Sequence, residues 1–319
     1  MSLAAHAIVE RTRQTAFANE LLTGLRAAPK RIPSKFFYDA AGSELFERIT
    51  TLPEYYPTRT ELSILTANLA GIAALIGSDV ELVEFGAGSL RKVRLLLNGL
   101  TKPRTYVPID ISGEYLLDVA TALEAEYPHV CVNPIVADFT RPIALGPLEC
   151  SAMHRVGFFP GSTIGNFSRA GAVSFLRNAR QTLDGGPLLI GVDLVKDPNV
   201  LHAAYNDAEG VTEAFNKNLL LRANRELGAD FDVGAFEHYA FYNPLAQRIE
   251  MHLISRKRQR VHLCGETIEF ADGETIHTED SHKYTLDGFR ALAADAGYMP
   301  RRVWTDEEQL FSLQWLEAV

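Results

Sequence analysis

The sequence predicts an α/β protein with a doubly wound, mostly parallel β-sheet and a second domain that is built partly from an insertion. From residue 80 onward, short apolar segments alternate with amphipathic helical segments, as they do in right-handed βαβ units. This alternation stops after residue 196 and returns near residue 285. A chain of 319 residues is also long for one compact core, which favours two domains or one domain with a large insertion.

Each element of this sheet has its own sequence signal. We expect strands at 80–85, 104–111, 130–139, 154–162 and 186–195, and helices at 89–100, 113–127 and about 168–183. A helix at 285–298, with Gly297 as its C-cap, and a hairpin of two strands would complete the sheet. We therefore assign 62–195 and 284–319 to the sheet domain, and 1–61 and 196–283 to the second domain.

The composition excludes several classes of function. The net charge of −9 argues against binding of a nucleic-acid backbone, and the basic run at 255–260 is expected to be a solvated turn. Cys131, Cys150 and Cys264 share no CxxC spacing, which favours reduced thiols over a disulfide framework or a zinc site. No segment resembles a signal peptide or approaches the roughly 20 apolar residues of a membrane helix. We expect a monomeric, cytoplasmic protein that uses a small molecule and has no nucleic-acid or membrane partner.

A glycine-rich turn marks the expected cofactor site. VEFGAGS (83–89) follows a strand and opens a helix, so that Gly86 and Gly88 allow a ligand to approach the backbone closely. A dinucleotide fingerprint would need a third glycine where this chain has Arg91, which makes an NAD site the weaker alternative. The form acidic-x-Gly-x-Gly instead resembles the first motif of class I S-adenosylmethionine (SAM) methyltransferases. An α/β protein without a nucleotide is the simpler alternative that the turn alone leaves open.

Three further side chains at strand ends favour the SAM interpretation. Asp110 ends the second strand, where a carboxylate can accept hydrogen bonds from both ribose hydroxyls. Asp138 and Phe139 end the third strand and suit an adenine amino group and a stacking face. Because the carboxyl ends of parallel strands meet at one edge of the sheet, we expect these groups to share one site.

The loop after the fourth strand is the expected substrate site. FFPGSTIGNFS (158–168) lacks the Asp/Asn-Pro-Pro-Tyr/Phe motif of nucleic-acid amino-methyltransferases. It offers Gly161, Thr163 and Asn166, a small polar set that can bind a carboxylate or an amine by directed hydrogen bonds.

A second polar stretch, IHTEDSHKY (276–284), adds candidate ligands for a ring. Glu279 and Ser281 are two residues apart, so on an extended strand they project to one face, whereas Asp280 and His282 project to the other. A polar loop on a solvated edge is one alternative. A metal site made of His277, Glu279 and His282 is another, but no fourth ligand is evident.

A family resemblance extends over nearly the whole chain. KFFYDAAGSELFERITTLPEYYPTRTE, EFGAGSLRK, GSTIGNF, GVDLVKD, AYNDAEGVTEAFNKN, FDVGAFEH, RIEMHL and TEDSHKY closely resemble, in order and spacing, the L-histidine Nα-methyltransferases of ergothioneine biosynthesis. The resemblance implies a Rossmann-like class I methyltransferase fold, with the second domain binding substrate. It also implies transfer of three methyl groups to the α-nitrogen of histidine, giving hercynine, with SAM as methyl donor and without a metal.

The resemblance also implies roles for individual residues. The cofactor would contact Tyr38, Gly86, Gly88, Lys92, Asp110, Asp138 and Phe139. The histidine carboxylate and α-amine would be held by Tyr55, Asn166 and Tyr205, and its imidazole by Glu279 and Ser281. Phe46, Phe215 and Met251 would line the reacting nitrogen and the ring, and Gly161 would leave room beside them.

The chemistry of methyl transfer agrees with these residue types. In-line displacement at a sulfonium demands alignment of nitrogen, methyl and sulfur, and we expect Tyr55 and Asn166 to orient the lone pair of the amine. Aromatic faces attract a methylated ammonium, which has lost its hydrogen-bond donors. Two alternatives stay open: a SAM-dependent methyltransferase of another amino acid or small amine, and a non-catalytic protein that binds SAM or histidine. Of the remaining residues, we expect Tyr56 to serve packing and Arg59 and Glu61 to form an ion pair within a helix.

Overall fold

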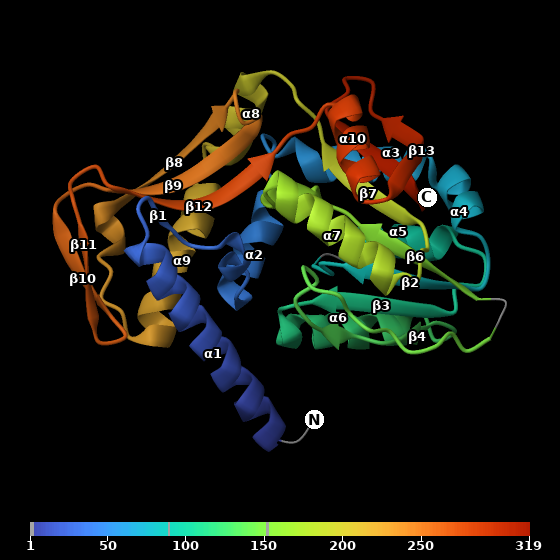
Figure 1. The fold of residues 1–319 in the computed structure, drawn as a ribbon, viewed down its shortest axis with the longest axis horizontal. Helices are drawn as coiled ribbons and strands as arrows, with labels where there is room; N and C mark the ends of the chain where they lie inside the picture. Colours follow the sequence, from blue (N-terminus) through green and yellow to red (C-terminus); the bar gives the residue numbers. More distant parts are fainter. Residues whose placement is uncertain (1–2, 89, 151–152) are drawn as a thin grey trace. The chain divides into compact units, whose positions relative to one another are not determined.

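The computed structural model describes residues 3–88, 90–150 and 153–319 (Figure 1). These residues form two compact units. Unit 1 consists of the described residues up to Tyr55 together with Pro198–Ser281, and unit 2 consists of the described residues of 56–197 together with His282–Val319. Residues 56–61, which we expected to belong with the lead-in segment, thus lie in unit 2.

Unit 2 contains the doubly wound sheet that the alternating pattern predicts (Figure 1). Its strand order is β13-β14-β7-β6-β2-β3-β4, with β5 paired to β3. Strands β2, β3, β4, β5, β6 and β7 pair in parallel, whereas β14 runs antiparallel to both β7 and β13. The strands are β2 (Val80–Phe85), β3 (Thr105–Asp110), β4 (Cys131–Val132), β5 (Ile135–Val136), β6 (His154–Phe159), β7 (Leu188–Asp193), β13 (Tyr298–Thr305) and β14 (Phe311–Ala318). The order reverses between β2 and β6, which is where an open parallel sheet places its ligand crevice.

Helices cover both faces of this sheet because its central strands are apolar on both sides. On β2, Leu82 packs into one core with Leu65 and Leu96, whereas Val83 packs into the other core with Phe175. The helices of unit 2 are α3 (Tyr56–Ala67), α4 (Leu69–Ile76), α5 (Leu90–Gly99), α6 (Gly113–Glu126), the 3-10 turn η2 (Thr163–Asn166), α7 (Arg169–Thr182) and α10 (Leu286–Asp295). Helix α10 is shorter than the helix predicted over 285–298. Ala296 is its C-cap, and Gly297, with φ of 81°, turns the chain into β13.

The strand predicted over 130–139 is wrong in its length. The structure has two short pieces instead, β4 (Cys131–Val132) and β5 (Ile135–Val136), both paired with β3. Pro134 lies between them and has no N–H to donate, so the ladder is interrupted at this point. As a consequence, Asp138 and Phe139 follow the last strand piece rather than end a continuous strand.

Unit 1 is built around a second, smaller sheet with the order β1-β12-β9-β8 and a separate β10–β11 hairpin (Figure 1). Helices α8 and α9 pack on β8, and α9 also packs on β9 and α2. The strands are β1 (Lys30–Arg31), β8 (Phe236–Asn243), β9 (Arg248–Ser255), β10 (Gln259–Leu263), β11 (Glu266–Phe270) and β12 (Thr275–His282). The helices are α1 (Leu3–Arg26), η1 (Ser34–Phe37), α2 (Ala40–Ile49), α8 (Pro198–Tyr205), α9 (Val211–Leu227) and η3 (Val233–Ala235).

Within the described ranges, no single helix has the length and apolar character needed to cross a membrane. Helices α3 and α4 pass that test only as a pair that is bent by 73°. Their apolar side chains Ile64, Leu65, Ile72 and Ile76 are buried in the core of unit 2, which accounts for the composition of the pair.

Candidate active site

An aromatic cluster in unit 1 gathers residues for which the family resemblance implied contact with the reactants. The Phe46 ring lies 5.6 Å from the Tyr38 ring, 6.3 Å from the Tyr55 ring and 6.0 Å from the Phe215 ring, measured between centroids. Tyr38 and Phe215 also meet edge to face at 5.8 Å. Tyr38, Phe46 and Tyr55 are only partly buried, so this cluster combines ring faces and phenol groups at an accessible place.

The second polar stretch forms strand β12, and its side chains divide between the two faces of the sheet. Burial alternates along the strand but changes phase between Thr278 and Glu279, which are both buried. The Thr278 hydroxyl donates to the Asn216 amide oxygen at 2.7 Å, and Ser281 accepts a hydrogen bond from the Tyr205 hydroxyl at 2.8 Å. Glu279 and Ser281 are 9% and 5% exposed, so a carboxylate and a hydroxyl lie buried on this strand, and the hydroxyl is bonded to Tyr205.

Asp280 belongs to a different set of contacts. Its carboxylate pairs with Arg248 at 3.0 Å and contacts Nε2 of His277 at 3.0 Å. The side chain is therefore held by Arg248 and His277 while Ser281 bonds to Tyr205. Sequence periodicity predicted this separation of Asp280 from Glu279 and Ser281.

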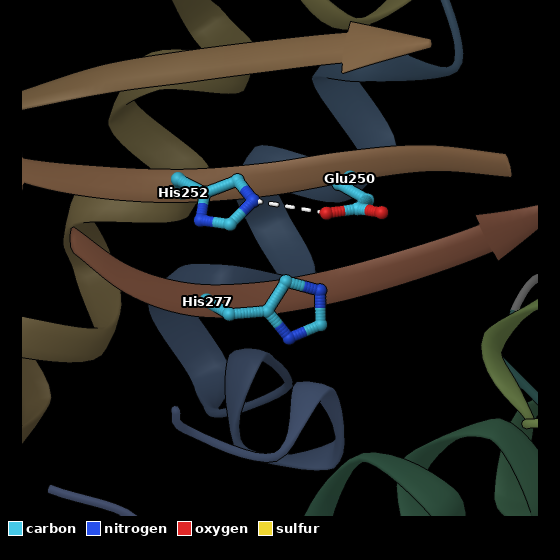
Figure 2. Close-up of side chains that lie close together, drawn as sticks. All are labelled: Glu250, His252 and His277. Atoms are coloured by element: carbon cyan, nitrogen blue, oxygen red, sulfur yellow. Dashed lines mark hydrogen bonds and ion pairs between the residues drawn. The ribbon is translucent and has the colours of Figure 1, made fainter. Parts of the chain in front are cut away.

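A group of metal-type donors, Glu250, His252 and His277, lies on the neighbouring strands β9 and β12 (Figure 2). One ligand atom from each residue lies within 4.8 Å of the others, and Nε2 of His252 is 3.3 Å from the Glu250 carboxylate. However, Arg248 pairs with the same carboxylate at 2.8 Å and so supplies the positive charge that an ion would bring. Burial, together with the charge of His277, lowers the pKa of His252, which keeps its imidazole neutral.

This group differs from the metal set that the sequence suggested as an alternative. His277 contacts Asp280, and Nδ1 of His282 lies 3.0 Å from the Gly165 carbonyl oxygen. These two histidines therefore have structural partners of their own.

In unit 2, the expected cofactor residues stand at the carboxyl ends of successive strands. Gly86 follows β2 with φ of 75°, a conformation that favours glycine. Asp110 ends β3, where one carboxylate oxygen accepts a hydrogen bond from the Ser112 amide at 2.7 Å. Asp138 accepts from the Thr140 amide at 3.0 Å. These two bonds hold both carboxylates in fixed orientations.

The surroundings of the glycine turn fit a SAM molecule. A Cβ at Gly86 would lie 3.5 Å from the Phe139 ring, so the turn and this ring adjoin. A Cβ at Gly88 would have no described atom within 4 Å, which leaves open space above the turn. An aromatic face, an open turn and two carboxylates are the groups that an adenosine requires for stacking and for its hydrogen bonds.

Glu84, the acidic residue of the glycine motif, is buried two residues before Gly86. The Tyr106 hydroxyl donates a hydrogen bond to its carboxylate at 2.6 Å. Burial raises the pKa of Glu84 to about 8, although that hydrogen bond and the nearby Lys92 act to lower it. The carboxyl group is thus largely protonated at neutral pH.

Sequence reasoning missed the role of Glu61. We expected it to pair with Arg59 on its own helix, but its carboxylate forms a buried ion pair with Lys92, a predicted cofactor residue. Both carboxylate oxygens also accept from the Gly161 amide at 3.0 Å. Glu61 therefore reaches the loop after β6 that also carries Asn166, which is partly exposed at the end of η2.

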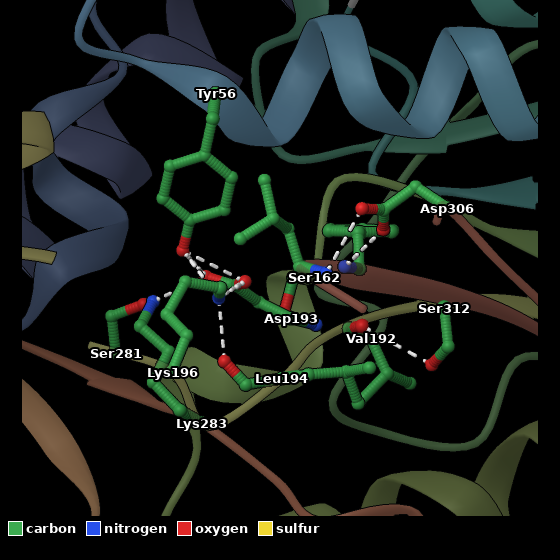
Figure 3. A network of polar contacts seen from close by, with 12 residues as sticks. Tyr56, Ser162, Val192, Asp193, Leu194, Lys196, Ser281, Lys283, Asp306 and Ser312 are labelled. Carbon is green, nitrogen blue, oxygen red and sulfur yellow. Dashed lines mark hydrogen bonds and ion pairs between the residues drawn. The ribbon is translucent and has the colours of Figure 1, made fainter. Parts of the chain in front are cut away.

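A second buried network, around Asp193 at the end of β7, was also missed (Figure 3). The Tyr56 hydroxyl donates to the carboxylate at 2.7–2.8 Å, and the ammonium groups of Lys196 and Lys283 pair with it at 2.5 and 2.8 Å. The Asp193 amide donates to the Ser162 hydroxyl at 2.9 Å. Burial opposes the ionised state of Asp193, but Lys283 and Lys196 hold its pKa below the ordinary value. Tyr56, which we expected only to pack, is thus a polar partner of this carboxylate.

Residues 17–318 match the model of a family described as histidine-specific methyltransferases that depend on SAM. The chain belongs to this family. It is therefore a SAM-dependent methyltransferase, and the doubly wound sheet with its hairpin is the class I fold of such enzymes.

Relatives with assigned activities cover most of the chain. A histidine N-alpha-methyltransferase of Mycolicibacterium smegmatis is 43% identical over 304 residues, which are 93% of this chain and 94% of that protein. A histidine N-alpha-methyltransferase of Mycobacterium tuberculosis is 42% identical with the same coverage. The ergothioneine biosynthesis protein 1 of Neurospora crassa is 32% identical across 87% of this chain and 32% of its own length.

Proposed function

We propose that this enzyme transfers three methyl groups in succession from SAM to the α-amino nitrogen of L-histidine and so forms hercynine, the first step of ergothioneine biosynthesis. The membership of the family and the names of the mycobacterial relatives support this choice of substrate and of the α-nitrogen. The structural observation that carries it is the burial of two polar side chains on β12, Glu279 and Ser281, of which Ser281 is hydrogen-bonded to Tyr205.

Glu279 and Ser281 would bind the imidazole of the substrate by hydrogen bonds. A carboxylate that accepts the ring N–H is left unpaired when phenylalanine or leucine binds instead, and an unpaired buried acceptor is a large penalty. Tyr55 and Tyr205 would bind the α-amine and the carboxylate of the amino acid, and Met251, which is 1% exposed, would pack against the ring. In unit 2, we assign to Asn166 the orientation of the reacting amine, and to Gly161 the space beside it.

Successive methylation requires a site that keeps its hold as the amine loses N–H donors. SAM supplies an electrophilic methyl group on a cationic sulfur. The amine must be neutral before each attack, and a partly desolvated, cationic neighbourhood lowers its affinity for protons. The ring faces of Phe46, Phe215 and Tyr38 attract a methylated ammonium by cation–π interaction, which does not depend on N–H groups.

The methyl donor would be bound by the glycine turn, by side chains at the ends of β3 and after β5, and by Tyr38 and Lys92. Its contacts are proposed to be Tyr38, Gly86, Gly88, Lys92, Asp110, Asp138 and Phe139. Asp110 would accept from the ribose, and Phe139 would stack on the adenine, since these groups stand at the ends of β3 and after β5.

Calorimetry of a Glu279→Gln variant tests the assignment of the substrate. One hydrogen bond to a charged acceptor is worth about 1.5–3 kcal/mol, so the Kd of histidine should rise about 10-fold to 100-fold while the Kd of SAM stays the same. Glu237→Gln is the matched control, because Glu237 is exposed on β8 of the same sheet. Equal losses of histidine and SAM affinity, or no loss of either, would contradict the role of Glu279.

A further inference from the structure

Glu61 is a buried carboxylate that touches both sets of residues assigned to the site in unit 2. It lies on α3, its side chain is 1% exposed, and it pairs with the ammonium of Lys92, which is 9% exposed. Both oxygens accept from the Gly161 amide at 3.0 Å. One residue therefore binds a predicted cofactor ligand and a predicted substrate residue at the same time.

The neighbouring strand leaves room for this carboxylate. A Cβ added to Gly191 on β7 would come within 2.2 Å of an oxygen of Glu61, so any side chain there would displace it. A Cβ on Gly161 would lie 3.4 Å from Nζ of Lys92, which shows how closely the three groups meet. Gly161 itself has φ of 78°, which other residues rarely adopt.

Stability alone does not explain a buried ion pair at this place. The cost of removing two charges from water often exceeds their attraction, and apolar residues of similar volume are frequently as stable or more stable. A lysine ammonium has three N–H donors, so a fixed bond to one carboxylate also fixes the directions of the other two. The carboxylate further cancels a positive charge that would oppose a sulfonium cation nearby.

We propose that Glu61 is a positioning residue for methyl transfer: it orients the Lys92 ammonium toward the methyl donor and fixes the Gly161 loop beside the reacting amine. This inference rests on the proposed function for the roles of Lys92 and Gly161. It assigns to Glu61 no contact with either reactant.

Binding of SAM to the full chain tests this proposal without any assumption about the amino acid. Glu61→Gln should keep the fold but weaken SAM binding at least 10-fold by calorimetry and lower kcat with the amine that the wild type methylates. The matched control is Glu81→Gln, which breaks another largely buried ion pair of unit 2, that of Glu81 on β2 with Arg155 on β6 at 2.7 Å. The control should lower the Tm but leave the Kd of SAM within twofold.

Two further variants separate positioning from support of the fold. In Glu61→Gln combined with Lys92→Met, no buried charge is left unpaired, so the Tm should recover whereas SAM binding should not. Glu61→Asp keeps the charge but shortens the side chain by one methylene; it should fold even if Glu61→Gln does not, and weaken SAM binding at least threefold.

Wild-type Kd and kcat in Glu61→Gln, or an unchanged Kd in Glu61→Asp, would overturn the proposal. Recovery of both Tm and SAM binding in the double variant would do so as well. If the wild type methylates an amine other than histidine, the proposed function fails, yet the binding comparison among these variants still decides the role of Glu61.

Discussion

Asp193 bonds to one residue beside each of the three places where the chain leaves one unit and enters the other. The passages are Tyr55–Tyr56, Asp197–Pro198 and Ser281–His282, and the partners of Asp193 are Tyr56, Lys196 and Lys283. The side chains of Asp193 and Lys283 are 1% exposed and that of Lys196 is 5% exposed, so solvent screens these ion pairs little. Asp193→Asn would leave two buried ammonium groups without their carboxylate.

The expected loss can be set from this arrangement. Breaking a buried ion pair by removing one partner costs about 3–5 kcal/mol, because the remaining charge stays buried. We therefore expect the free energy of unfolding of unit 2 to fall by at least about 3 kcal/mol in Asp193→Asn. A loss of that size is a large fraction of the stability of an ordinary domain, about 5–15 kcal/mol.

Urea denaturation followed by tryptophan fluorescence measures this loss in unit 2, because the two tryptophans of the sequence, Trp304 and Trp315, lie on β13 and β14. Ser312→Ala is the control. It removes two neutral hydrogen bonds, one to the carbonyl of Val192, next to Asp193, at 3.2 Å and one from the Gln314 amide at 3.1 Å, and each should cost about 0.5–1.5 kcal/mol. A loss below about 1 kcal/mol in Asp193→Asn, or a loss equal to that of Ser312→Ala, would refute the reasoning.

Two other variants test the chemistry of single groups. The raised pKa of Glu84, about 8 against an ordinary 4.5, favours the neutral form in the folded state, so its contribution to stability is full below pH 4.5 and is lost as pH rises toward 8. Glu84→Gln is neutral at every pH, so its free energy of unfolding relative to that of the wild type should increase by up to about 1.4 kcal/mol for each pH unit between 4.5 and 8. An equal difference in urea midpoints between the two proteins at pH 5 and at pH 8.5 would disprove the linkage. Tyr55→Phe should lower kcat about 3-fold to 10-fold with an unchanged Tm, because one oriented hydrogen bond to the amine is lost. Tyr239→Phe, at an exposed position on β8, is its control, and identical rates for both variants would remove Tyr55 from the reaction.

Local sequence patterns predicted the sheet of unit 2 well because apolar strands alternate there with amphipathic helices. They failed at Pro134, where a missing N–H interrupts a segment whose composition otherwise suits a strand. The closing hairpin was predicted and is formed by β13 and β14, with Trp315 buried in the core.

The missed parts of the site are contacts between distant residues. Closeness in sequence suggested Arg59 as the partner of Glu61, although side chains two residues apart on a helix do not face each other. The partner in the structure is Lys92, from another element. The Tyr56 hydroxyl bonds to Asp193, 137 residues away, and no local pattern encodes such a pair. The motif GVDLVKD contained a signal, since a carboxylate and a lysine three residues apart follow an apolar strand, yet it gave no hint of the further partners.

The most direct test of histidine trimethylation is a reaction with SAM that carries a ¹³C-labelled methyl group, offered an equimolar mixture of the twenty amino acids. Mass spectrometry would identify which amino acid gains mass, and NMR would identify the nitrogen that bears the label. We predict three labelled methyl groups on the α-nitrogen of histidine and on no other amino acid. Label on the imidazole, termination after one or two transfers, or preferential methylation of a different amino acid would contradict the proposed function.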